Sequence, residues 1–72
     1  MELSNCIKEY RIKLGNMTQE ELAKKIGVSR QTIISIEKSR FVPSTILALK
    51  IASVFNINVE SIFFLNESGG IK

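Results

Sequence analysis

Residues 18–38, TQEELAKKIGVSRQTIISIEK, predict two short helices joined by a tight turn. Thr18 followed three residues later by Glu21 is the capping-box pattern of a helix N-terminus. Gly27 comes directly after the last apolar residue of the first segment, where a left-handed residue commonly ends a helix. Ser29 is a favourable N-cap for the second segment. This arrangement is a helix-turn-helix unit, whose second helix enters the major groove of DNA.

The outward face of the second helix carries side chains that can read base pairs. Arg30 can bond O6 and N7 of guanine in a fork, and Gln31 can bond N6 and N7 of adenine. Ile34 is an apolar residue on a face that should be exposed to solvent, and contact with a thymine methyl group would explain its presence there. The expected base contacts are Arg30, Gln31, Ile34 and Ser35. The alternative is an amphipathic helical hairpin with a merely polar outer face, which this turn, this order of caps and the surrounding basic charge disfavour.

Length and composition exclude several classes of protein. The 72 residues suit one domain, and at 44% hydrophobic residues the chain has enough apolar surface to fold without staples. It has no histidine and a single cysteine, Cys6, so zinc and disulfide scaffolds are excluded, and we expect no metal or other cofactor. Without histidine or aspartate no nucleophile–base pair can be composed, so we do not expect an enzyme.

Two further expectations concern the surroundings of the protein. The first residues lack the charged region and apolar run of a signal peptide, and no apolar stretch approaches the roughly 20 residues of a membrane span. We therefore expect a soluble, cytoplasmic protein with no membrane partner. Because no second domain is evident, we expect no small-molecule ligand.

Positive charge is concentrated on the helix-turn-helix unit. The formal net charge is +3, and residues 24–40 contain five basic residues but one acid, Glu37. From residue 41 onward the charges cancel. A basic patch on the reading unit is what a polyanionic partner requires.

The rest of the chain predicts three more helices and no strand, hence an all-α fold of five helices. Apolar residues at three- and four-residue steps mark a first helix: Leu3, Ile7, Tyr10 and Leu14. Ser4 or Asn5 can cap it. Ser44 caps a fourth helix, and a last helix runs over about residues 59–64. The domain then spans residues 1–65, with residues 66–72 as a flexible tail.

Two features suggest contacts between parts of the molecule or between molecules. Arg11 lies at the edge of the buried face of the first helix and needs a carboxylate, and the one acid of the reading helix predicts an Arg11–Glu37 ion pair. Residues 62–65 are four large apolar residues that a single helix face cannot bury. We expect a homodimer interface there, formed by Ile62, Phe64 and Leu65. The alternative function is a protein-interaction module, such as an antitoxin or anti-repressor, that uses the same surface.

The unit of residues 18–38, the following FVPSTxLALKIA and the closing VESIF resemble the Cro/phage-repressor-type helix-turn-helix regulators, in particular their short single-domain members. The likeness runs from about Ile7 to Phe63. It implies a compact, five-helix, lambda-repressor-like DNA-binding domain, a homodimer on a palindromic operator, and regulation of transcription, usually repression. The chain departs from the family in a longer loop at residues 15–17 and in Ser39 and Arg40, which stand where many relatives have Asn-Gly.

The resemblance also carries residue roles. Arg30, Gln31 and Ser35 are similar to the family's base-contacting positions, and an arginine of the family's first helix pairs with a glutamate of its third. Gln19 is similar to its phosphate-contacting glutamine, an expectation that its place in the first turn of a helix supports independently. The expected phosphate contacts are Gln19, Lys24, Ser29, Thr32, Lys38, Arg40 and Ser44.

Overall fold

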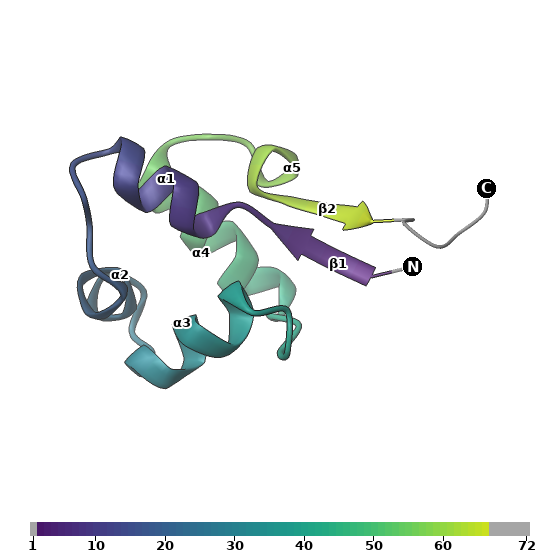
Figure 1. Cartoon of the computed structure of the whole chain (residues 1–72), viewed down its shortest axis with the longest axis horizontal. Helices are drawn as coiled ribbons and strands as arrows, with labels where there is room; N and C mark the ends of the chain where they lie inside the picture. The colour runs from purple at the N-terminus through teal and green to yellow at the C-terminus, as the bar shows by residue number, and fades with distance from the viewer. Residues whose placement is uncertain (1, 67–72) are drawn as a thin grey trace.

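The computed structural model describes residues 2–66, and these residues form five helices and two short strands (Figure 1). In chain order they are β1 (Glu2–Asn5), α1 (Ile7–Lys13), α2 (Gln19–Ile26), α3 (Arg30–Glu37), α4 (Thr45–Phe55), α5 (Val59–Ile62) and β2 (Phe63–Asn66). Figure 1 shows α4 behind α1, between the helix-turn-helix pair α2–α3 and α5, with the two strands extending from one end of the helical part. The predicted five helices are confirmed.

Every helix contributes to one apolar core. The side chains with no or almost no exposed surface are Ile7, Leu22, Ile33, Ile36, Ile51 and Ile62, which come from α1, α2, α3, α4 and α5. Burying each such side chain contributes about 1.5–3 kcal/mol to folding before the entropy cost. The core therefore fixes α3 on its inner side and leaves its outer side for other contacts.

The local signals of the helix-turn-helix unit work as the sequence predicts. The backbone N–H of Glu21 donates to Oγ1 of Thr18 at 3.0 Å, and the N–H of Thr18 donates to Oε1 of Glu21 at 2.7 Å, which completes the capping box. Gly27 ends α2 with φ of +77°, a left-handed conformation that suits glycine. Oγ of Ser29 accepts from the backbone N–H of Thr32 at 3.1 Å and so begins α3.

The longest helix of the described part, α4, is also bounded as expected. Oγ of Ser44 accepts from the N–H of Leu47 at 3.1 Å, and left-handed Asn56 ends the helix. With 11 residues α4 is short, and no helix between Glu2 and Asn66 is long and apolar enough to cross a membrane.

The prediction of no strand is wrong. β1 and β2 pair antiparallel, with Glu2 opposite Asn66 and Asn5 opposite Phe63. Strands of four residues are too short to show a clear alternation, and their pairing joins opposite ends of the sequence, which local patterns do not encode. Leu3 consequently lies in a strand rather than in the first helix.

Because of the two strands, the bounds of α1 and α5 differ from the predicted ones. α1 begins at Ile7 after Cys6 and ends at Lys13, so Leu14, expected on its buried stripe, lies past the helix and is half exposed. α5 ends at Ile62 instead of near residue 64. Asn66, expected in the tail, is the last residue of β2, and residues 67–72 of that expected tail lie outside the described residues.

Candidate nucleic-acid interface

The outward side of α3 is one stripe of polar and basic side chains. Ile33 and Ile36 point into the core. At about 100° per residue, positions 31, 34, 35 and 38 then fall on the opposite side of the helix, and position 30 falls at the edge of that side. Arg30 and Gln31 are exposed in the first turn, and Ile34 and Ser35 are partly buried behind them. The structure therefore places all four expected base contacts on one accessible face.

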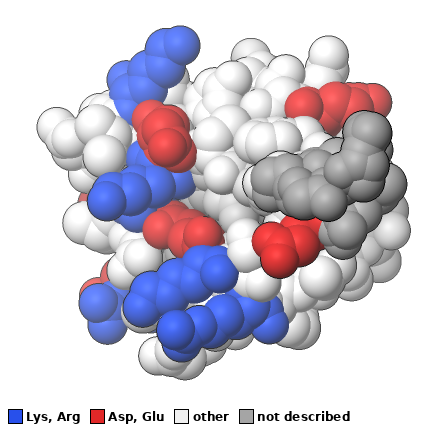
Figure 2. All heavy atoms as spheres, turned by 45° about the vertical axis from the view of Figure 1, so that its right-hand side comes forward, with Lys and Arg blue, Asp and Glu red and all other residues white. Residues whose placement is uncertain are grey.

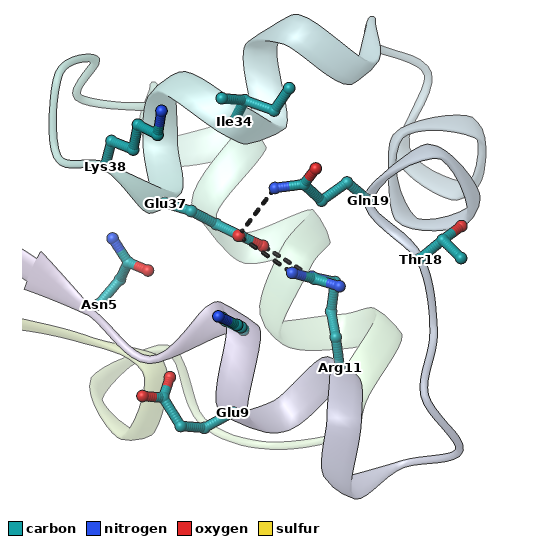
Figure 3. A pocket seen from close by; sticks show the side chains of 9 residues that line it. Asn5, Glu9, Arg11, Thr18, Gln19, Ile34, Glu37 and Lys38 are labelled. Carbon is teal, nitrogen blue, oxygen red and sulfur yellow. Dashed lines mark hydrogen bonds and ion pairs between the residues drawn. The ribbon is translucent and has the colours of Figure 1, made fainter.

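Glu37 connects α3 to two other helices (Figure 3). Nε of Arg11 donates to Oε2 of Glu37 at 2.7 Å, and Nη2 of Arg11 donates to Oε1 at 3.1 Å, so the predicted ion pair is present and bidentate. Nε2 of Gln19 donates to the same Oε1 at 3.1 Å. Nη1 of Arg11 donates to the carbonyl oxygen of Met17, in the loop between α1 and α2, at 2.8 Å. This network joins α1, α2 and α3 around one carboxylate.

The same network affects the net charge of the outward stripe of α3. Glu37 is the one acid of α3, and its charge is neutralised by Arg11, which is 8% exposed. Figure 2 shows one face of the molecule, on which basic side chains gather along one side with carboxylates between them. The outward stripe of α3 itself carries the positive charges of Arg30 and Lys38 and no carboxylate.

A groove of about 640 Å³ lies between α1, the first turn of α2 and α3. The Arg11–Glu37 pair lies in it, and it is also lined by Lys8 from α1, Gln19 from α2 and Lys38, the C-cap of α3. Figure 3 shows Gln19 reaching from α2 toward Glu37, beside Ile34 of the reading stripe. Lys8 was missed in the sequence because only the tertiary fold brings the first turn of α1 opposite α3.

The other expected phosphate contacts are more scattered. Lys24 is exposed in the last turn of α2, away from the groove, where it lines separate surface hollows with Lys25. The hydroxyls of Ser29 and Thr32 lie 3.0 Å apart and share a hydrogen bond within the cap of α3. Arg40 has an exposed side chain.

Two of these residues lie beyond the C-terminal end of α3. The backbone N–H of Arg40 donates to the carbonyl of Ser35 at 2.9 Å, which ties the loop to the helix. Ser44 is exposed at the start of α4, where its hydroxyl accepts the capping bond. Neither Arg40 nor Ser44 lines the groove between α1, α2 and α3.

The expected dimer interface needs a correction. Ile62 is completely buried in the core, so it has no surface to offer a partner. Phe64 and Leu65 are exposed, but successive residues of a strand point to opposite faces of the sheet. The structure also exposes apolar residues elsewhere, on the loop after α3 and on α4: Phe41, Val42, Ile46 and Leu49.

The thiol of Cys6 is not a reactive group of this site. Its Sγ donates to the carbonyl oxygen of Ser61 at 3.2 Å. Burial and the nearby carboxylate of Glu9 raise the pKa of Cys6, which favours the protonated thiol over the nucleophilic thiolate. Among residues 2–66 no group of three or more His, Cys, Asp or Glu residues could hold a metal ion.

Comparison with known proteins agrees with this geometry. A family model described as helix-turn-helix matches residues 7–62. An uncharacterized HTH-type transcriptional regulator of Archaeoglobus fulgidus is 57% identical over 61 residues, covering 85% of this chain and 84% of the relative. Another of Methanocaldococcus jannaschii is 54% identical over 65 residues, covering 90% and 97%. A crystal structure from Bacteroides fragilis, described as a candidate DNA-binding protein, has a TM-score of 0.76 at 24% identity and covers 86% of this chain and 98% of its own; it supports the fold.

Proposed function

Because the chain belongs to the helix-turn-helix family, we propose that it is a transcriptional regulator that binds a palindromic DNA operator as a homodimer and acts as a repressor. The observation that carries this proposal is the outward stripe of α3. It combines exposed Arg30 and Gln31 with a carboxylate-free surface, because Arg11 neutralises Glu37.

The residues of the stripe and of the groove divide the work of binding. With α3 in the major groove, Arg30 and Gln31 bond base edges, each contributing about 1–3 kcal/mol against a wrong base. Ile34 contacts a thymine methyl group, and Ser35 extends the same surface. Lys8, Gln19 and Lys38 line the groove and contact phosphates, which orient the protein without specifying sequence.

The remaining phosphate contacts flank this surface at both ends of α3. Ser29 and Thr32 lie at its start, and Arg40 and Ser44 follow its end. Lys24 adds positive charge at a greater distance, through the general attraction of a basic patch for DNA. In the homodimer the two half-sites lie about 34 Å apart, one turn of the double helix. Leu65 provides the main contact between the two copies, and Phe64, on the opposite face of the sheet, contributes less.

A protein-interaction module is a second candidate function. Val42 and Ile46, on and after the loop that follows α3, are 67% and 70% exposed. Exposed apolar residues of this size favour a protein partner when they form a continuous surface. An antitoxin or anti-repressor would use such a surface and leave the stripe of α3 without a base-reading role.

Fluorescence anisotropy separates the two functions. Duplexes enriched from a random pool are titrated with wild type, Gln31→Ala, Lys38→Ala and, as a lysine away from the stripe, Lys50→Ala across a salt series. We expect wild type to select a palindrome and Gln31→Ala to lose discrimination at one base pair in each half-site, by about 1–3 kcal/mol. Lys38→Ala should weaken binding to all duplexes similarly and reduce the salt slope by about one phosphate contact, whereas Lys50→Ala should not.

The opposite result is equally clear. If no sequence is enriched, and weak binding is lost by about 200 mM salt, the basic charge acts only as a general attraction for polyanions. The regulator function is then wrong, and the exposed apolar residues become the surface to test with protein partners.

A further inference from the structure

Asn5, the last residue of β1, connects two helices to which it does not belong. Its Nδ2 donates to the carbonyl oxygen of Ile36 in α3 at 2.8 Å, and its Oδ1 accepts from the backbone N–H of Ile7, the first residue of α1, at 3.2 Å. The last four carbonyls and first four N–H groups of a helix have no partner within the helix. The one amide of Asn5 therefore satisfies the N–H of Ile7 at the start of α1, and it gives the carbonyl of Ile36 at the end of α3 a second donor beside the N–H of Ser39, at 2.9 Å.

These bonds matter because few polar contacts, beside the shared apolar core, connect α3 to α1. α3 packs mainly on α2, and the groove of about 640 Å³ separates it from the first turns of α1. Among residues 2–66, the side-chain hydrogen bonds that join β1 and α1 to α3 are the Arg11–Glu37 ion pair and the bond from Asn5 to Ile36, and Gln19 of α2 adds a third bond to Glu37. The ion pair and the Asn5 bond hold two adjacent residues in the last turn of α3, Glu37 and Ile36. Two such points restrain how far the helix can rotate about its axis.

The identity of the residue also fits this role. Asparagine is depleted in strands, because its side chain neither packs well on a sheet nor favours extended backbone. At this position both ends of its amide are used, the N–H as a donor and the oxygen as an acceptor. An alanine offers neither group, and an aspartate offers only the acceptor.

We propose that Asn5 is a positioning residue that fixes the orientation of α3, and thereby the discrimination between DNA sequences, through its bond to Ile36. The inference rests on the proposed function. Rotation of α3 moves Arg30 and Gln31 relative to base edges, and directional bonds tolerate little displacement. Attraction to phosphates is far less directional, so general DNA binding survives the same movement.

The test compares Asn5→Ala and Asn5→Asp with Asn58→Ala. Asn58 is the N-cap of α5 but makes no side-chain hydrogen bond to it, so it is a matched control. Asn5→Asp keeps the acceptor for Ile7 and removes the donor to Ile36. Anisotropy gives the Kd for the enriched duplex and for an unrelated duplex of equal length, and urea unfolding gives the folded fraction of each variant at the assay temperature.

We expect the ratio of the two Kd values to fall about fivefold in both Asn5 variants, as the loss of one hydrogen bond implies, and to stay unchanged in Asn58→Ala. The added charge of Asn5→Asp weakens both Kd values, which is why the ratio is the readout. An unchanged ratio in both Asn5 variants overturns the proposal. So does an equal weakening of both Kd values in Asn5→Ala, because loss of folded protein alone produces it.

Backbone hydrogen exchange provides a readout that does not depend on DNA. The N–H groups of Lys38, Ser39 and Arg40 bond carbonyls in the last turns of α3, and that of Ser39 shares the carbonyl of Ile36 with Asn5. We expect these three amides to exchange faster in Asn5→Asp than in Asn58→Ala, with α4 unchanged. If wild type prefers no duplex, the proposed function fails and exchange alone decides. Unchanged exchange at the three amides then overturns the role of Asn5.

Discussion

At the scale of single residues, the interface depends on one carboxylate. Glu37 receives two bonds from Arg11 and one from Gln19, and the two charged side chains are 9% and 10% exposed. Removing two charges from water costs several kcal/mol each, and only their mutual geometry offsets this cost. The ion pair therefore contributes little net stability. Its main effect is to favour the one arrangement of α1, α2 and α3 in which both charges are paired.

This reasoning predicts a marked asymmetry between single and double substitutions of the pair. Arg11→Met and Glu37→Leu should each lower the free energy of unfolding by about 3–5 kcal/mol, because each leaves a buried charge without its partner. The double variant, with two apolar side chains facing each other, should recover most of that loss. Urea unfolding followed by circular dichroism measures all three.

A small effect would contradict the prediction. Exposed ion pairs contribute about 0–1 kcal/mol, so single substitutions within that range would mean that water reaches both charges. Lys13→Met, on the exposed side of α1, is the matched control for loss of a basic side chain.

At the scale of elements, the orientation of α2 begins at its capping box. The backbone N–H of Thr18 donates to the carboxylate of Glu21, and this donor, followed by the nearby Thr18 hydroxyl, lowers the pKa of Glu21 below its ordinary value. A depressed carboxyl pKa stabilises the folded state above the unfolded pKa, and the contribution is lost as pH falls through the folded pKa. The start of α2, which carries Gln19, should therefore be sensitive to acid.

The prediction concerns Glu21→Gln, which keeps an oxygen acceptor for Thr18 but does not titrate. Wild type should be more stable than Glu21→Gln at pH 7, and the difference should shrink as the pH falls below about 4.3 and vanish near the acid limit. Thermal unfolding of both proteins between pH 7 and pH 3 measures the difference. Glu20→Gln, in the same turn but outside the capping box, is the control, and a difference that persists at low pH would show that the charge of Glu21 is not its cause.

The elements also show what the sequence could and could not predict. α2, α3 and α4 carry their signals locally, in caps such as Thr18 and Ser44 and in stops such as Gly27, and these helices lie where the sequence places them. The Arg11–Glu37 pair could be predicted because a single acid on α3 leaves few choices. The strands could not, since Leu3 and Leu65 meet only after the whole chain has folded.

The same limit applies to the site. Lys8 reaches the groove, and the amide of Asn5 reaches the end of α3, through tertiary contacts that no local pattern encodes. The burial of Ile62 escapes the sequence pattern for a related reason. A run of four apolar residues does not tell which of them faces the core, and the answer depends on the strand that begins at Phe63.

At the scale of the whole molecule, we propose that the homodimer forms through the two strands at one end of the helices (Figure 1). Leu65 pairs with Leu3, and Phe64 pairs with Ser4, so the two exposed apolar residues belong to opposite faces of the sheet. The face of Leu65 continues through Leu3 into a hollow of about 420 Å³. The opposite wall of that hollow includes Phe41 and Val42 from the loop after α3.

The two faces predict different roles for their exposed residues. Leu65, 62% exposed on the face of the sheet that it shares with Leu3, can bury its side chain against a second copy, whereas Phe64 shares its face with polar Ser4. We expect Leu65→Ser to weaken dimerisation by about a hundredfold or more, since it removes about 1.5–3 kcal/mol of apolar burial from each of two symmetric contacts. Phe64→Ser should weaken it much less. Sedimentation equilibrium over a range of concentrations gives the dimer constant of each protein.

The same variants test whether dimerisation and DNA binding belong together. A monomeric Leu65→Ser protein should still bind a single half-site through α3, but should lose the preference for two half-sites about 34 Å apart. Anisotropy on duplexes with one or two half-sites measures that preference. If Phe64→Ser is the variant that dissociates, the opposite face of the sheet forms the dimer. If wild type sediments as a monomer at every concentration and still prefers the palindrome, the two copies meet only on DNA.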